Sequence, residues 1–484
     1  MLVGDDGAVV ASATVEHVPF ASPGPAWAEQ DPADWWRASQ EAVRTVLKES
    51  GVAPRSIAAV GLSGQMHGAV ILGEKNEIIR PAIIWCDQRT DEQCAWLTDK
   101  IGAARLLELT LNPALPNFTL TKFLWVRQHE PELWKRVRHV LLPKDYVRLM
   151  LSREYAIDVA DASGTLLLDV AKRRWSSDVL EAAGLPASIL PSVFESPEIC
   201  ARVSPEASAL TGLPEGTPIV AGAGDQAAGA VGMGITRPGA VSATIGTSGV
   251  VFAATDRPAL DPKGRLHTFC HAIPGRWHVM GVTQAAGLSL RWIRDHWSQT
   301  GGAAVSYDRL TEEADRVPAG SDGVLWAPYL MGERTPHLDS SVRAALIGLS
   351  ASHTRGHVVR AVLEGVAFSL RDTFTIFGEL GVPVEKIRVG GGGARSRLWR
   401  EIQAGVYGHA VETVTAEEGA AYGAALLAGV GAGVWPTVDT ACDAGVHAAE
   451  VTRPNVADAA VLDQRYQEFR RIYPAIKKIA LTSS

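Results

Sequence analysis

A short turn of small residues carries a carboxylate where a proton acceptor could act. The run Gly222–Gly229 follows an apolar, strand-like segment, Pro218–Ala221, and presents Asp225 at the mouth of that strand. Small neighbours let a substrate approach closely, and a carboxylate is a ready general base. Asp225 is therefore the candidate catalytic residue.

Two other interpretations of this turn compete with catalysis. A tight turn whose Asp caps the next helix would give the same pattern. The spacing Gly222-x-Gly224-x-x-Ala227 also fits a dinucleotide-binding fingerprint, which expects an acidic residue about 20 positions further on. No Asp or Glu stands between Asp225 and Asp256, so the fingerprint fails this check.

A hydroxyl-rich hairpin tip is the first candidate phosphate-binding loop. Gly246, Thr247 and Ser248 lie between two strand-like runs, residues 241–245 and 250–253. Such a tip offers several backbone N–H groups and two hydroxyls, and its glycine allows close approach. An ordinary hairpin loop is the alternative interpretation.

A glycine run is the second candidate loop for a nucleotide. Gly390–Gly393 follows the strand-like residues 387–389 and precedes Ala394. Its flat backbone at a strand-to-helix junction would accept a planar base or a phosphate, whereas tight packing of helix on sheet would need the same glycines. The chain has no GxxxxGK[ST] motif, which excludes a P-loop NTPase.

A loop with polar side chains follows another buried strand. Gln65, Met66 and His67 come just after the strand predicted over residues 57–63. An amide and an imidazole at a strand end suit recognition of a polyol through hydrogen bonds. A structural histidine with satisfied hydrogen bonds is the alternative.

Composition limits the class of protein. The chain has 484 residues, 46% hydrophobic and 20% charged, which predicts a globular protein of two or more domains. A net charge of −7 argues against nucleic acid or an anionic membrane as partner. Its five cysteines show no CxxC spacing, and no signal peptide or spanning segment is visible. We expect a cytoplasmic protein.

The elements that must position these loops follow from local signals. Asp31 and Pro32 start a predicted helix that ends at Gly51. A long helix is predicted over residues 358–377, and an amphipathic one over 456–473. The strand pattern restarts after Gly239. We therefore expect an N-terminal domain over residues 1–238, a C-terminal domain over 239–430 and a helical segment over 431–484.

Taken together and in order, the motifs resemble those of the FGGY carbohydrate kinases, and of the xylulokinases among them, in the actin-like ATPase superfamily. The resemblance runs from about residue 1 to 480. The stretches that carry it are Gly61–Gly68, Trp85-x-Asp87-x-Arg89, Leu142–Tyr146, Gly224–Gly229, Gly246–Ser248, Tyr329–His337, Ala344–Glu364 and Gly391–Ala394.

The resemblance implies an α/β fold in which two RNase-H-like domains flank a catalytic cleft. It implies ATP-dependent phosphorylation of D-xylulose to D-xylulose 5-phosphate. Asp225 would take the proton from the C5 hydroxyl. Met66 and His67 would contact the sugar, with Gln65 and Gln226 as further contacts; Gln226 stands where Asn is common in the family.

For the nucleotide, the resemblance implies ATP bound against the second domain. Gly246, Thr247 and Ser248 would lie near the phosphates, and Gly392 and Gly393 near the adenosine. Similarity to glycerol kinase adds two candidates, Gly287 and Arg397. Mg²⁺ would bridge the phosphates, with no residue assigned to hold it. The resemblance also admits a homodimer.

One departure from the family pattern concerns the N-terminus. Family members begin with a strand, Asp-x-Gly-Thr and a second strand, whereas this chain starts near that second strand, at Met1-Leu2-Val3. A misassigned start, a shortened chain and a degenerate kinase would each explain this. The expectation is an unfilled core and weak kinase activity. The competing functions are another FGGY sugar or polyol kinase and a catalytically impaired, kinase-derived sugar-binding protein.

Overall fold

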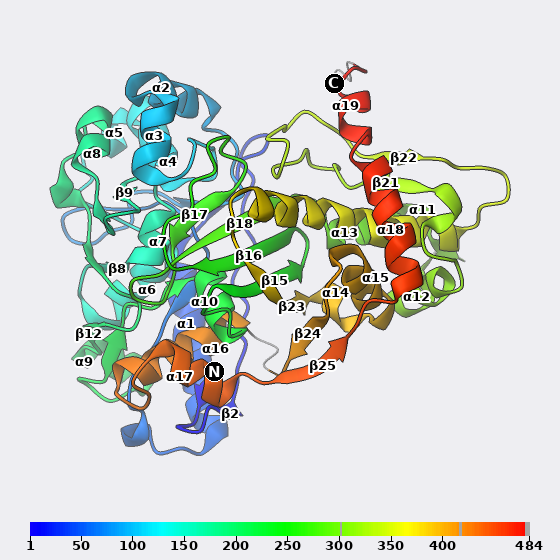
Figure 1. Cartoon of the computed structure of the whole chain (residues 1–484). Helices are drawn as coiled ribbons and strands as arrows, with labels where there is room; N and C mark the ends of the chain where they lie inside the picture. Colours follow the sequence, from blue (N-terminus) through cyan, green and yellow to red (C-terminus); the bar gives the residue numbers. More distant parts are fainter. Residues whose placement is uncertain (301–302, 416–418, 480–484) are drawn as a thin grey trace.

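The chain folds into two α/β domains that share an extensive contact (Figure 1). The computed structural model describes residues 1–300, 303–415 and 419–479. Residues 1–238 are here the first domain and residues from 239 onward the second. Among the described residues, no helix combines the length and apolar character needed to cross a membrane.

The first domain is built from helices and mostly short strands. Its helices are α1 (Pro32–Ser50), α2 (Asp91–Ile101), α3 (Ala103–Thr110), α4 (Thr119–His129), α5 (Pro131–Trp134), α6 (Pro143–Ser152), α7 (Val159–Ser163), α8 (Ser177–Ala183), α9 (Pro205–Thr211) and α10 (Asp225–Gly232). Its strands are β1 (Leu2–Val3), β2 (Val9–Ala11), β3 (Glu29–Gln30), β4 (Ser63–Gly64), β5 (Val70–Leu72), β6 (Ala82–Ile83), β7 (His139–Leu141), β8 (Ala156–Asp158), β9 (Leu168–Asp169), β10 (Arg174–Trp175), β11 (Ser192–Phe194), β12 (Ile199–Arg202), β13 (Pro218–Val220) and β14 (Ala223–Gly224).

The second domain has longer strands. They are β15 (Gly239–Ile245), β16 (Gly249–Thr255), β17 (His267–Cys270), β18 (Trp277–Thr283), β19 (Gln299–Thr300), β20 (Ala303–Ala304), β21 (Leu325–Ala327), β22 (Ala345–Ile347), β23 (Val384–Gly391), β24 (Val411–Val414) and β25 (Ala448–Thr452). Its helices are α11 (Gly287–Trp297), α12 (Tyr307–Asp315), α13 (Arg355–Glu379), α14 (Gly392–Arg395), α15 (Arg397–Tyr407), α16 (Gly419–Gly431), α17 (Val438–Gly445), α18 (Val456–Phe469) and α19 (Ile472–Ile476).

A seven-stranded sheet in the order β17-β18-β16-β15-β23-β24-β25 forms the centre of the molecule. Strand β16 shows how both of its faces are covered. Val251 and Ala253 belong to the core that includes α13, whereas Phe252 and Ala254 belong to a core shared with the first domain. Because successive side chains of a strand point to opposite faces, the first domain packs directly on one face of this sheet.

The first helix shows local signals at work. Helix α1 begins after Asp31, whose side chain accepts a hydrogen bond from the Ala33 N–H, and Pro32 occupies the first helical position. It ends at Gly51, which has φ of 65°. Both predicted ends are confirmed, because capping chemistry lies within a few residues of the sequence.

The strand predicted over residues 57–63 forms only in part. Val60 makes a parallel bridge to Ile219, and β4 pairs with β14. These residues border a cavity of about 930 Å³, which is also lined by residues of β1, α1 and α16. The cavity also reaches Asp225 at the start of α10. The unfilled core expected from the sequence stays a prediction.

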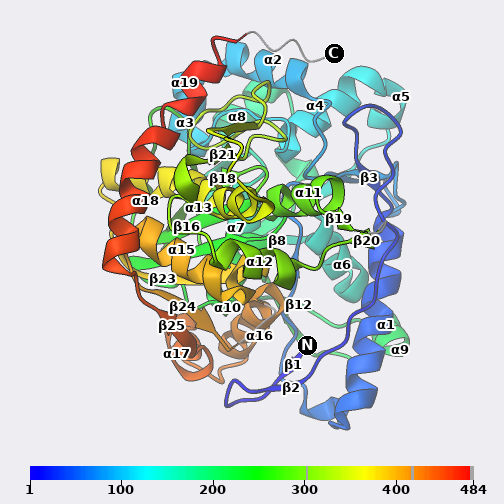
Figure 2. The same ribbon diagram turned by 90° about the vertical axis from the view of Figure 1, so that its right-hand side faces the viewer.

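Helices α16 and α17 pack on the first domain, whereas the following strand, β25, belongs to the sheet of the second domain. Helices α16 and α17 pack beside α10 in both views (Figures 1 and 2). A Cβ on Gly423 would lie 1.9 Å from the Ala228 carbonyl oxygen, so only glycine permits this approach. Residues 431–484 are not purely helical, since β25 pairs with β24 at the sheet edge.

Candidate active site

Two short parallel strands bring the sugar-site candidates together. In the pair β4 and β14, Ser63 lies opposite Ala223 and Gly64 opposite Gly224. Both strands end at that point, and parallel strands present their carboxyl ends at one edge. Gln65, which starts a loop, and Asp225, which starts α10, therefore lie at neighbouring strand ends, although 160 positions separate them in the chain.

Asp225 has the environment of a base rather than of a helix cap. It is the first residue of α10, and the N-cap position belongs to Gly224, which makes no side-chain cap bond. Burial raises the pKa of the Asp225 carboxyl to about 6, while hydrogen bonds from Gln226 and the Met66 backbone oppose that rise. Part of the residue stays accessible, so the carboxylate can meet a ligand near neutral pH.

The two glutamines near Asp225 have different partners. The Gln226 backbone N–H donates to Asp225 Oδ1 at 2.9 Å, and its side chain also hydrogen-bonds to Asp225. Gln65 Nε2 donates to Gln30 Oε1 at 2.8 Å, and Gln65 borders the same cavity as Asp225. In this structure Gln226 thus orients the candidate base.

His67 is buried and held in one tautomer. Its Nδ1 lies 2.7 Å from the Gly164 carbonyl oxygen, so Nδ1 carries the hydrogen and Nε2 is left as an acceptor. Burial, and then the charge of Lys122, lower its pKa to about 3, so the ring is neutral. Nε2 has no hydrogen-bond partner among the described residues, so it can accept a hydrogen bond from a hydroxyl.

A network of buried charges supports this edge from behind. Asp145, Asp158 and Asp161 offer ligand atoms within 4.8 Å of one another. Lys144 Nζ lies 2.7 Å from Asp158 and also bonds Asp145, and Arg148 Nη1 lies 2.6 Å from Asp145. Lys144 and Arg148 thus supply two positive charges beside these three carboxyl groups.

The candidate nucleotide loops also meet at one strand edge. Strands β15 and β23 are parallel neighbours in which Ile245 pairs with Gly391. The hairpin tip at Gly246 therefore lies beside the glycine run at Gly392, and the Gly287 N–H donates to the Gly246 carbonyl at 2.8 Å. Three loops from distant parts of the sequence form one surface.

Glycine is required at two of these positions because the backbones are close. A Cβ on Gly287 would lie 2.4 Å from the Gly246 carbonyl oxygen. One on Gly393 would lie 2.6 Å from Ile245 Cβ. Gly392 differs, since its Cβ would meet nothing nearer than 3.9 Å. Gly392 is thus free of packing constraints and exposed to the pocket.

A pocket of about 710 Å³ occupies this surface. It is lined by Gly246, Thr247, Gly287, Gly392, Gly393 and Arg397, all of them candidates from the sequence. Ser248 does not line it; its carbonyl accepts the Gly246 N–H and closes the hairpin. Arg397 pairs with Asp315 at 2.7 Å and with Glu401 at 2.6 Å.

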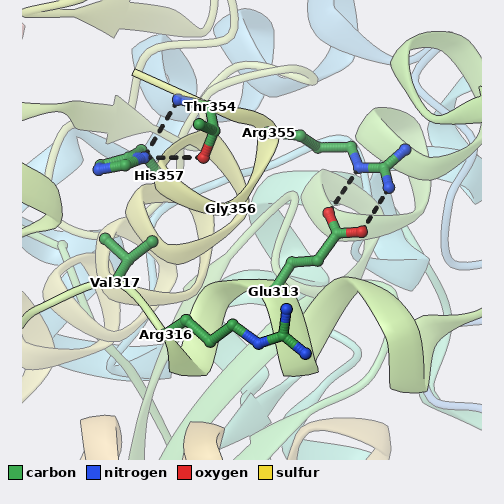
Figure 3. A pocket seen from close by; sticks show the side chains of 7 residues that line it. All are labelled: Glu313, Arg316, Val317, Thr354, Arg355, Gly356 and His357. Atoms are coloured by element: carbon green, nitrogen blue, oxygen red, sulfur yellow. Dashed lines mark hydrogen bonds and ion pairs between the residues drawn. The ribbon is translucent and has the colours of Figure 1, made fainter. Parts of the chain in front are cut away.

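Sequence reasoning missed one whole wall of this pocket. Residues of α12 supply it, namely Tyr307, Asp308, Thr311, Glu312 and Asp315. They form an ordinary polar helix face in the sequence, and no spacing signal could have marked them. A smaller hollow of about 460 Å³ lies where α12 ends and α13 begins. Figure 3 shows two pairs of its residues in contact, Arg355 with Glu313 and His357 with Thr354.

The fold and these two sites define a sugar kinase of the actin-like ATPase type. The N-terminal domain of the FGGY family of carbohydrate kinases matches residues 1–232, and its C-terminal domain matches residues 241–432. The chain belongs to this family, and the expected fold of two RNase-H-like domains is confirmed.

Named relatives agree with this assignment. The chain is 37% identical over 479 residues to a xylulose kinase of Bacillus subtilis, covering 99% of this chain and 95% of that one. It is 38% identical to a xylulose kinase of Lactococcus lactis, with the same coverage of both chains. A crystal structure of a xyloylose kinase from Brucella ovis superimposes with a TM-score of 0.89 at 35% identity, covering 96% of this chain and 94% of that one.

Proposed function

We propose that the protein transfers the γ-phosphoryl group of ATP to the C5 hydroxyl of D-xylulose. The observation that carries this proposal is the β4–β14 pairing, which places the Asp225 carboxylate beside the loop of Met66 and His67. The similarity to xylulose kinases supports the choice of sugar. The assignment of each site residue is part of the proposal.

Asp225 would act on the sugar hydroxyl. Its carboxylate accepts the hydroxyl proton as the oxygen forms its bond to the γ-phosphorus and the bond to the ADP oxygen breaks. The raised pKa suits this step, because a base is most effective when its pKa lies near the working pH. Gln226 keeps the carboxylate in place through two hydrogen bonds.

The second domain would bind ATP. The exposed backbone at Thr247 offers an N–H group to a phosphate oxygen, and the flat surface at Gly392 suits the adenosine. In phosphoryl transfer, Mg²⁺ bound to the phosphates supplies charge neutralisation. Most of what the protein contributes is positioning.

The test is a coupled assay of ADP formation with D-xylulose, D-ribulose, gluconate and glycerol as acceptors. The proposal expects turnover with D-xylulose above the other three, abolished by EDTA and restored by Mg²⁺. A higher kcat/KM with another acceptor would indicate a different FGGY kinase. Binding of D-xylulose without turnover would favour a kinase-derived sugar-binding protein. A cytoplasmic location and a homodimer stay predictions.

A further inference from the structure

Arg334 is a cation at the junction of the two domains. It belongs to the segment of the chain that connects β21 to β22 in the second domain. Its Nη2 donates to Asn117 Oδ1 of the first domain at 3.1 Å, and its Nη1 lies 3.3 Å from His267 Nε2. It belongs to the stretch Tyr329–His337, one of those that carry the resemblance to the family.

Within the described residues, the Arg334 guanidinium has no carboxylate at ion-pair distance. Burial lowers the pKa of Arg334 to about 10, so it is still charged at neutral pH. Burial raises the pKa of the adjacent Glu333 to about 8, which leaves that carboxyl largely protonated. A half-buried charge of this kind needs a polar partner.

The two hydrogen-bond partners of Arg334, Asn117 and His267, are neutral acceptors, and some N–H donors of the guanidinium stay unused by them. Asn112 donates its amide N–H groups to the Thr110 and Thr268 carbonyls, so its Oδ1 accepts from His267 Nδ1 at 3.0 Å. His267 therefore presents Nε2 as an acceptor toward Arg334. A guanidinium has five N–H donors, and only the bonds to Asn117 and His267 use them within the described part of the chain.

The ring of Phe118 lies between His267, a partner of Arg334, and the sugar-site histidine. Phe118 contacts His67 on one side, at 4.9 Å between ring centroids, and His267 on the other, at 5.6 Å. Lys122 Nζ donates to the His67 carbonyl at 2.8 Å and also to that of Asn117. The charge of Arg334 contributes to the low pKa of His67. His67 thus has Asp225 near one end of its loop and Arg334 near the other.

The end of the acceptor sugar that lies far from Asp225 requires a hydrogen-bond donor from the protein. A 2-ketopentose that closes into its furanose ring uses its C5 hydroxyl to do so. Only the open-chain form offers a free C5 hydroxyl, and that form has a free C2 carbonyl. A carbonyl oxygen accepts hydrogen bonds and donates none, so the site must supply a donor there.

We propose that Arg334 determines specificity for ketoses by donating hydrogen bonds to the carbonyl end of the open-chain sugar. This inference rests on the proposed sugar kinase function. It makes the second domain part of the sugar site, so that the sugar contacts both domains while its C5 hydroxyl meets Asp225. A pentitol, which has a hydroxyl in place of the carbonyl, would gain less from this cation.

The test compares D-xylulose with xylitol in the wild type, Arg334→Leu and Arg334→Lys, using KM for the ketose and the inhibition constant for xylitol. Arg334→Leu should raise the KM for D-xylulose about 10- to 150-fold, the effect of losing a hydrogen bond from a charged donor. The constant for xylitol and the KM for ATP should change less than about twofold, and Arg334→Lys should recover part of the loss.

Arg343→Leu is the matched control, since Arg343 is an exposed arginine on the same segment that bonds only carbonyls of its own loop. Equal losses for the ketose and xylitol together with a lower Tm would show a purely structural bridge between the domains and overturn the inference. Unchanged constants in Arg334→Leu would also overturn it. If the wild type instead prefers another acceptor, the proposed sugar fails, and D-ribulose with ribitol provides the same comparison for Arg334.

Discussion

Gly64 and Gly224 lie opposite each other in a parallel strand pair, and both strands end there. A Cβ on Gly224 would approach Met66 Cγ to 2.8 Å and Asp161 Oδ1 to 3.0 Å. The backbone must therefore be bare at this point for Met66 and Asp225 to lie close together. The relation explains why a carboxylate and a polar loop from distant parts of the chain form one site.

Asp225→Asn should lower kcat by about 10²- to 10⁴-fold, because positioned proton transfer contributes that much. The KM for the sugar should change little, since the amide keeps the size of the carboxyl group. A coupled ADP assay measures both constants, with Asp99→Asn on the exposed face of α2 as the control. A kcat within about threefold of the wild type, far below the general-base range, would remove Asp225 from the role of base.

Protonation of Asp225 should lower kcat/KM at acidic pH. Its pKa is raised to about 6, and only the deprotonated carboxylate accepts a proton, so kcat/KM should fall about tenfold per pH unit below that value. His67, with a pKa near 3, cannot produce this limb. A pH profile of kcat/KM from pH 5 to 8 measures it. The same limb in Asp225→Asn would assign it to another group.

His67→Ala should weaken binding of the sugar and leave binding of the nucleotide unchanged. Loss of the Nε2 acceptor leaves a sugar hydroxyl unpaired, which corresponds to about 1–3 kcal/mol, or a 5- to 150-fold higher KM for D-xylulose. The KM for ATP should stay within about twofold. His139→Ala, which removes a ring stacked on Tyr155 away from the site, is the control. Equal increases of both KM values would give His67 a structural role.

Substitutions of two adjacent glycines, Gly392 and Gly393, distinguish an effect on packing from an effect on nucleotide binding. Gly393→Ala places a methyl group 2.6 Å from Ile245 Cβ, so it should lower stability by about 1–3 kcal/mol and also raise the KM for ATP. Gly392→Ala meets no atom within 3.9 Å, so Tm should not change while the KM for ATP rises. Thermal unfolding and ATP kinetics measure the two effects. Unaltered ATP kinetics in Gly392→Ala would remove Gly392 from the nucleotide site.

Local signals in the sequence determined the elements and the loops that could carry chemistry. Asp31 and Gly51 specify the ends of α1 through capping, and the hairpin around Gly246 follows from two β-prone runs around a glycine-rich tip. His67 and Asp225 could be singled out because small residues and polar groups at strand ends are visible within a few positions. These features depend on contacts between neighbours in the chain.

Only the tertiary structure decided which of these residues meet. The pairings of Gly64 with Gly224 and of Ile245 with Gly391 depend on long-range strand registers. The wall of α12 in the nucleotide pocket and the approach of Arg334 to Asn117 arise from packing between segments far apart. Nothing in the local pattern of a polar helix or an arginine distinguishes these positions. Their chemistry comes from burial and from partners that the folded chain brings together.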